Sequence, residues 1–152
     1  MLSLIILVTL LLDQGSKAIV QMMMYHGESI PVLPPVFYLT YIHNPGAAFG
    51  LLAYQTPLFI AVAVLLTMGV LLGYQKLSRE RYLLRCGLLL ILGGTLGNLT
   101  DRLRHGYVVD FIDFRVFPVF NLADTAIVAG ACLLVWELFK NEDKQQKKES
   151  EL

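Results

Sequence analysis

The sequence predicts an all-α integral membrane protein with four transmembrane helices and a small extracytoplasmic β-rich cradle between the first two helices. Three observations lead to this fold class. Of the 152 residues, 56% are hydrophobic and only 16% are charged, which is far from the balance of soluble domains. Four apolar runs approach the roughly 20 residues that a helix needs to cross a bilayer. Between the first two runs lies a segment rich in aromatic and β-branched residues, which is typical of a strand.

The four apolar runs are bounded by charged residues or proline and leave little chain for a soluble domain. They cover residues 2–24, 57–75, 82–99 and 122–139. The first run resembles a secretory signal in length, but no basic residue precedes it and no small-x-small cleavage site occurs before Met22. We therefore predict a retained helix, a single membrane-embedded domain over residues 1–140 and a polar cytoplasmic tail over residues 141–152.

Basic residues predict how the helices are oriented in the membrane. They cluster around the connection between the second and third runs and in the tail, at Lys76, Arg79, Arg81, Arg85, Lys140, Lys144, Lys147 and Lys148. Cytoplasmic loops carry an excess of Lys and Arg, and four crossings return the chain to the side where it started. Both termini are therefore predicted to be cytoplasmic. Residues 25–56 and 103–121 then form the extracytoplasmic segments, although Arg104 and Arg115 in the second segment depart from the rule.

The first extracytoplasmic segment contains the predicted strand. Residues 36–42 follow two prolines and stop at Asn44-Pro45-Gly46, so we expect an extended strand followed by a turn. Residues 47–50, which include two alanines and a glycine, would let the backbone approach another molecule closely. A substrate is one candidate for that molecule.

Two polar groups lie inside a predicted membrane helix or at its end, at a depth where ionisable side chains are costly and usually face the interior of the bundle. Asp13 and Lys17 are four residues apart on the first helix, which is the spacing of an ion pair. Asn98, Asp101 and Arg102 share a face near the outer end of the third helix, beside glycines that permit close helix packing. Spacing alone leaves each group as either a structural clamp or a brace for an outer site.

The second extracytoplasmic segment and the start of the fourth helix carry the candidate catalytic acids. Asp110 and Asp113 stand among bulky apolar residues, and Asp124 follows Asn121 by three positions. Capping of a helix N-terminus would by itself explain Asn121 and Asp124, but it does not explain the apolar-flanked acids. Two carboxylates at one interface favour a dyad that shares one proton, in which one acid polarises a carbonyl and the other activates water. This is the chemistry of aspartyl peptidases.

Other chemistries have less support in the sequence. Ser16 beside Lys17 invites comparison with a Ser/Lys nucleophile, but adjacent helical residues point about 100° apart. The histidines are scattered over two loops without the paired spacing of a zinc helix, so we expect neither a metal nor a cofactor. The basic residues flank membrane segments and the net charge is zero, so nucleic-acid binding has no support.

Five motifs, taken in order, resemble the lipoprotein signal peptidase family, also called signal peptidase II. They are DQGSK at 13–17, NPGAAFG at 44–50, GGTLGNLTDR at 93–102, VVDFIDF at 108–114 and FNLAD at 120–124. The resemblance implies an aspartyl endopeptidase of the bacterial inner (plasma) membrane, with Asp110 and Asp124 as the catalytic dyad near the extracytoplasmic face. It implies hydrolysis of diacylglyceryl-modified prolipoproteins immediately before the lipid-modified cysteine. Spacing alone does not choose Asp110 over Asp113.

The resemblance also implies residues that hold the dyad and orient the substrate backbone. These are Asp13, Lys17, Asn44, Gly46, Asn98, Asp101, Arg102 and Asn121. The partners would be prolipoprotein substrates and membrane lipid, and we expect a monomer. Two other classes stay open on the residues alone. A small transporter or proton-conducting bundle predicts flux in sealed vesicles, and a membrane scaffold predicts that function survives replacement of both acids.

Overall fold

The structure is a computed structural model that describes residues 2–46, 52–78 and 80–150, with the backbone alone for 2–3 and 141–150. The segment 47–50, expected to approach a substrate, and Arg79 of the basic cluster lie outside the described residues. Four long helices are present, each with a stretch long and apolar enough to cross a membrane. They are α1 (Leu2–Met23), α2 (Thr56–Lys76), α3 (Tyr82–His105) and α4 (Leu122–Ser150).

Two helices extend beyond the apolar runs that predicted them. Helix α3 ends at His105 rather than at residue 99, because Gly106 adopts a left-handed φ of 80° and donates its amide to Arg102 O. The extension places Asn98 and Asp101 inside the helix rather than at its end. Helix α4 continues to Ser150 rather than ending at residue 139, so the backbone of the predicted polar tail is helical as far as that residue.

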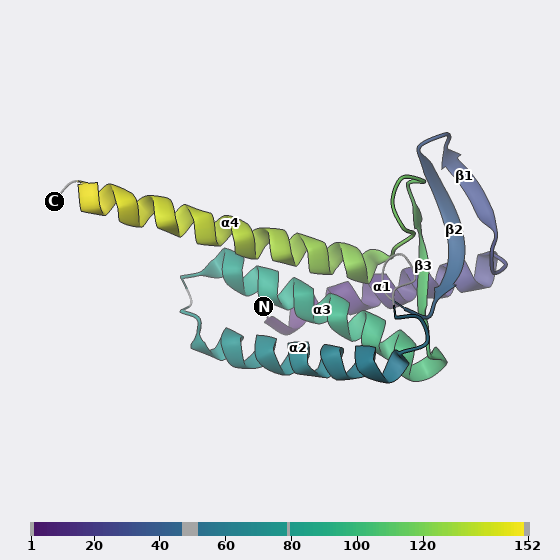
Figure 1. The fold of residues 1–152 in the computed structure, drawn as a ribbon, viewed down its shortest axis with the longest axis horizontal. Helices are drawn as coiled ribbons and strands as arrows, with labels where there is room; N and C mark the ends of the chain where they lie inside the picture. The colour runs from purple at the N-terminus through teal and green to yellow at the C-terminus, as the bar shows by residue number, and fades with distance from the viewer. Residues whose placement is uncertain (1, 47–51, 79, 151–152) are drawn as a thin grey trace.

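Helix α3 is the centre of the bundle and packs against α1, α2 and α4. Glycines make this packing close: a Cβ at Gly97 would lie 2.5 Å from Asp13 Oδ2, and one at Gly94 would overlap Ala123 O. The sheet lies at one end of the bundle, while the C-terminus and the α2–α3 connection lie toward the other end (Figure 1). The chain therefore folds with its helices alternating in direction and its strands gathered at one end.

The sheet corrects part of the predicted fold class. It has three antiparallel strands in the order β1 (Ser29–Leu33), β2 (Phe37–Asn44) and β3 (Val108–Asp113). The strand predicted at residues 36–42 is confirmed as β2, but "all-α" is wrong and the β structure is not confined to the connection between the first two helices. Strand β3 comes from the segment between α3 and α4. The spacing of apolar residues in this segment does not distinguish a strand from a loop. The segment is a strand because it pairs with β2.

The two faces of the sheet have different partners. Tyr41, Val109 and Phe111 form a buried core with Val20 and Met24 at the end of α1. Because successive side chains of a strand point to opposite faces, Asp110 lies on the other face of β3, away from this core. The packing of the sheet on α1 thus decides which acid of the VVDFID strand turns toward the rest of the bundle.

The glycine contacts of α3 predict a large difference between two alanine substitutions. Gly94→Ala would force the new methyl group into the backbone of α4, and overpacking of this kind costs about 1–3 kcal/mol. We expect a Tm in detergent roughly 5 °C or more below wild type. Gly73→Ala in α2 is the matched control, because a Cβ there meets no atom within 4 Å. Equal Tm values for the two variants, measured by circular dichroism, would contradict the packing described above.

Candidate active site

Asp110 lies in the middle of β3 and is 1% exposed. Both oxygens of its carboxyl group accept a hydrogen bond from a side-chain amide. Asn121 Nδ2 donates to Oδ1 at 2.6 Å, and Asn44 Nδ2 donates to Oδ2 at 2.8 Å. A carboxyl group buried this deeply requires such donors. The two amides, one from β2 and one from the start of α4, therefore hold the acid in a single orientation.

Asp124 lies in the first turn of α4, where it forms a reciprocal cap with Asn121. The amide of Asp124 donates to Asn121 Oδ1 at 2.9 Å, and the amide of Asn121 donates to Asp124 Oδ2 at 3.3 Å. The other oxygen of Asp124 accepts from Asn98 Nδ2 at 2.7 Å. The capping predicted from the spacing is thus present, and the same carboxyl group also reaches α3.

A cavity of about 290 Å³ brings the two acids together. Asp110 and Asp124 both line it. The remaining polar lining comes from Asn44, Gly46, Asn98 and Arg102, and the apolar lining comes from Phe59, Val108, Phe117, Pro118, Val119 and Phe120. A mostly apolar cleft with a few convergent polar groups is typical of a ligand site. The cavity is thus a candidate ligand site to which two carboxyl groups are presented.

Burial and the nearby charge of Asp124 raise the pKa of Asp110 to about 7. The hydrogen bonds from Asn44 and Asn121 and the charge of Lys17 act in the opposite direction without overcoming the rise. Two carboxyl groups in a site of low dielectric cannot both ionise easily, so their proximity favours a pair that keeps one proton. Such a pair contains one acid and one base, as hydrolysis by an activated water requires.

Asp113, which the residues alone left equal to Asp110, lies elsewhere. Thr40 Oγ1 donates to its Oδ2 at 2.6 Å, the Arg115 amide donates to its Oδ1 at 2.8 Å, and Arg115 Nη1 lies 3.4 Å from Oδ2. Burial raises the pKa of Asp113, but the Thr40 and Arg115 hydrogen bonds and the Arg115 charge outweigh it and bring the pKa below its usual value. Asp113 does not line the cavity. It anchors the end of β3.

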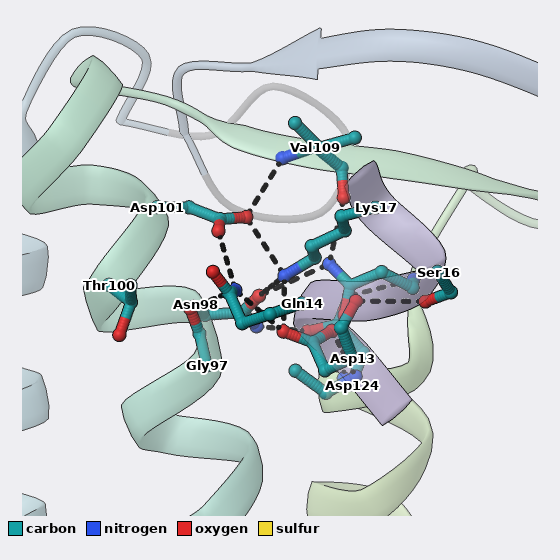
Figure 2. A network of polar contacts seen from close by, with 12 residues as sticks. Asp13, Gln14, Ser16, Lys17, Gly97, Asn98, Thr100, Asp101, Val109 and Asp124 are labelled. Carbon is teal, nitrogen blue, oxygen red and sulfur yellow. Dashed lines mark hydrogen bonds and ion pairs between the residues drawn. The ribbon is translucent and has the colours of Figure 1, made fainter. Parts of the chain in front are cut away.

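Lys17 is 3% exposed and joins α1 to α3 behind the cavity. Its Nζ lies 2.9 Å from Asp13 Oδ2, 3.0 Å from Asn98 Oδ1 and 2.8 Å from Asp101 Oδ2. Figure 2 shows these acceptors converging on the ammonium group between the two helices. The pair with Asp13 was predicted from the spacing. The pair with Asp101 was not, because nothing in the local pattern indicates which helices meet.

The carboxylates around Lys17 reach the two elements that carry the acids. Asp13 Oδ1 accepts the amide of Ala123 in the first turn of α4 at 2.9 Å. Asp101 Oδ2 accepts the amide of Val109 in β3 at 3.2 Å. A carboxylate placed at a helix N-terminus is favourable because unpaired amides and the positive end of the helix dipole meet it there. Residues far apart in the chain thus fix α4 and β3 relative to α1 and α3.

Gln14 takes part in this network, although it was not among the site residues predicted from the sequence. Its Nε2 donates to Asp101 Oδ1 at 2.8 Å and to Asp13 Oδ2 at 3.1 Å. Its Oε1 accepts from Arg104 Nη1 at 3.3 Å. The one available signal is its place beside Asp13 on a helix whose buried face is polar.

Arg102 lies at the cavity rather than in an ion pair with its neighbour Asp101. Its guanidinium group stacks over the ring of Phe59, 4.7 Å from the centroid, and Nη2 donates to Gly46 O at 3.1 Å. Adjacent helical residues point about 100° apart, so Asp101 turns toward Lys17 while Arg102 turns toward α2 and the end of β2. Among the described residues, no cluster of three or more His, Cys, Asp or Glu side chains forms a candidate metal site.

Comparison with known proteins identifies the family. Residues 5–140 match the family described as Signal peptidase (SPase) II. The chain belongs to the signal peptidase II family. This confirms the resemblance seen in the five motifs. It also makes the chain a bacterial integral membrane peptidase, in agreement with its four apolar helices.

Individual relatives extend the similarity over most of the chain. A lipoprotein signal peptidase of Pelotomaculum thermopropionicum is 62% identical over 145 residues, which cover 95% of each protein. One of Moorella thermoacetica is 54% identical over 135 residues, 89% of this chain and 90% of the relative. A solved bacterial membrane enzyme shares the fold with a TM-score of 0.89 at 30% identity, covering 94% of this chain and 90% of that one. The similarity to this membrane enzyme therefore extends over nearly the whole fold.

Proposed function

We propose that this signal peptidase II is an aspartyl endopeptidase whose catalytic dyad is Asp110 and Asp124. Its substrates are diacylglyceryl-modified prolipoproteins, and it cuts immediately before the lipid-modified cysteine. The peptidase activity and the substrate class follow from the family. The observation that carries the dyad is that both carboxyl groups line one cavity, each held by side-chain amides.

The chemistry assigns one role to each acid. The positive end of α4 favours an ionised Asp124, which takes a proton from water as the water oxygen attacks the scissile carbonyl carbon. Asp110 carries the shared proton and donates it to the carbonyl oxygen, which gives a tetrahedral diol. Collapse of the diol breaks the C–N bond, and the proton held by Asp124 passes to the leaving nitrogen. No covalent bond to the enzyme forms, and the original protonation state returns once the diol proton is back on Asp110.

The remaining site residues hold the dyad and the peptide. Asn44, Asn98 and Asn121 supply the amide donors to the two acids. Arg102 and Gly46 form one polar wall of the cavity, bonded to each other, and orient the substrate backbone from there. The substrate segment around the cut lies extended between this wall and β3.

We place the sheet and the cavity on the extracytoplasmic side, with both termini in the cytoplasm. The basic residues that mark the cytoplasmic side surround the α2–α3 connection, which lies at the end of the bundle away from the sheet (Figure 1). The precursor's apolar signal helix then enters sideways from the bilayer, and its lipid chains stay on the apolar outer surface of the bundle. Residues 1–140 form a single peptidase domain, and the enzyme works as a monomer.

Replacing each acid by its amide tests the dyad. We expect Asp110→Asn and Asp124→Asn each to lower kcat by about 1,000-fold or more, because the remaining acid has no partner to share the proton. Asp113→Asn is the matched control from the same strand and should retain activity within about threefold, since Asp113 does not line the cavity. The measurement is gel-based cleavage of a diacylglyceryl-modified precursor in nanodiscs at matched folded yield, with unlipidated precursor alongside. Full activity in Asp110→Asn or Asp124→Asn would overturn the assignment.

The pKa of Asp110 predicts a pH dependence. Asp110 must hold a proton to act as the acid, and its pKa of about 7 means that this proton is lost as the pH rises through that value. We expect kcat/KM to fall about tenfold per pH unit above this point, because kcat/KM reports the ionisation of the free enzyme. The profile should be measured from pH 5 to 9 in nanodiscs, with circular dichroism to establish that the fold is unchanged. A rate that stays constant to pH 9 argues against Asp110 as the acid.

A further inference from the structure

We propose that Lys17 is a positioning residue for catalysis: it fixes the polarity of the Asn98 amide, and through that amide it sets the hydrogen-bonding state of Asp124. This inference rests on the proposed dyad and adds a residue that does not line the cavity. The geometry that carries it is a chain of hydrogen bonds from Lys17 through Asn98 to Asp124, part of which is visible in Figure 2.

An asparagine amide can present either its oxygen or its nitrogen to a neighbour, so something must select one orientation. Asn98 Oδ1 lies 3.0 Å from Lys17 Nζ and 3.2 Å from Asn121 Nδ2. Both neighbours are donors, and an ammonium group has no lone pair with which to accept. The opposite orientation of Asn98 would set its NH₂ group against these two donors, so Lys17 excludes it together with Asn121.

The selected orientation directs Asn98 Nδ2 to Asp124 Oδ1 at 2.7 Å. The nitrogen of a neutral amide can only donate, so Oδ1 of Asp124 must accept and cannot carry the shared proton toward Asn98. The proton and the attacking water are therefore confined to the cavity side of the dyad. Asn121 works in the same way for Asp110, since its own oxygen is held by the Asp124 amide and its Nδ2 faces Asp110 Oδ1 at 2.6 Å.

Lys17 is itself held so that it cannot turn away. Its three N–H bonds point to three acceptors, and two of these are the carboxylates of Asp13 and Asp101. An ion pair with one carboxylate would neutralise the ammonium charge. A third acceptor is nevertheless present, and it belongs to the Asn98 amide, which contacts Asp124. A structural clamp between α1 and α3 would also need an acceptor for the third N–H, but the acceptor present here belongs to the amide that donates to Asp124.

The charged groups around the dyad come from several elements, and they define the effect of removing Lys17. Lys17 is positive and Asp13 negative on α1, Arg102 is positive and Asp101 negative on α3, and the dyad acids lie on β3 and α4. Lys17 favours the charged form of both acids, because a nearby positive charge stabilises a carboxylate. Without it, the acid limb of the pH profile, where the catalytic base takes up a proton, moves to higher pH.

The test uses a pair of substitutions that keeps the charge of the buried cluster unchanged. Lys17→Met combined with Asp13→Asn removes one positive and one negative charge, and the Asn oxygen can still accept the Ala123 amide that Asp13 accepts now. We expect kcat to fall about 100-fold with KM within about threefold of wild type, since Lys17 is behind the cavity. The charge of Asp13 opposes the larger effect of Lys17 on Asp124, so with both charges removed we expect the acid limb of the kcat profile to rise by less than one pH unit.

Gln14→Met is the matched control from the same helix and the same network. It removes hydrogen bonds to Asp13 and Asp101 but leaves the Lys17–Asn98 contact in place. We expect kcat within about twofold and an unmoved acid limb. Wild-type kcat and pH profile in the charge-balanced double variant would overturn the proposal, and so would an equal shift of the limb in Gln14→Met.

Asn98→Asp keeps the proposal testable if the double variant does not fold. It retains an oxygen for Lys17 but replaces the donor that faces Asp124 with an acceptor, so we expect a loss of about 100-fold in kcat and a shifted profile. Wild-type behaviour of a folded Asn98→Asp enzyme would reject the role given to the amide. The dyad itself is judged separately: if Asp110→Asn or Asp124→Asn stays active the proposed function fails, whereas normal Lys17 variants beside inactive dyad variants reject this inference alone.

Discussion

The buried ammonium group of Lys17 organises the polar interior of the bundle. An unpaired charge inside a membrane bundle costs several kcal/mol, so oxygen acceptors must converge on it from α1 and α3. Each acceptor makes a second contact. Asp13 caps α4, Asp101 binds the backbone of β3, and Asn98 binds Asp124. Satisfying one cation therefore determines where both elements that carry the acidic pair come to lie.

Such convergence requires the helices to approach more closely than ordinary side chains allow. Gly97 leaves room for the carboxylate of Asp13, and Gly94 lets the backbone of α4 come near α3. Within a bilayer no hydrophobic force draws helices together, so close packing and buried polar contacts must hold them. The glycines thus permit the close approach of the helices, and the hydrogen bonds of the charged network maintain it.

The acidic pair is held against its own repulsion. Two carboxyl groups that share a cavity resist joint ionisation, and burial raises the pKa of Asp110 to about 7. The amides of Asn44, Asn98 and Asn121 provide fixed donors where water would otherwise solvate the carboxyl groups. In the mechanism we propose, an arrangement that is costly for folding is in this way preorganised for proton transfer, because its dipoles need no rearrangement as charge moves.

The structure also separates two acids that neighbouring positions in the sequence make similar. Asp110 and Asp113 both lie in β3 among apolar residues, but three steps along a strand place their side chains on opposite faces. The packing of Val109 and Phe111 on the end of α1 decides which face is which. Asp113 then meets Thr40 and Arg115 at the edge of the sheet, while Asp110 meets the amides and the cavity.

Features that depend on local composition could be predicted from the amino-acid sequence. Apolar runs of sufficient length predicted four membrane helices, the spacing of Asp13 and Lys17 predicted their pair, and Asn121 with Asp124 predicted a helix cap. The ordered motifs were specific enough to indicate the family. The third strand, the pairing of Lys17 with Asp101 and the orientation of Asp110 toward the cavity depend instead on how the chain packs in three dimensions. These join segments tens of residues apart, and no periodicity within one segment records which distant segment will pack against it.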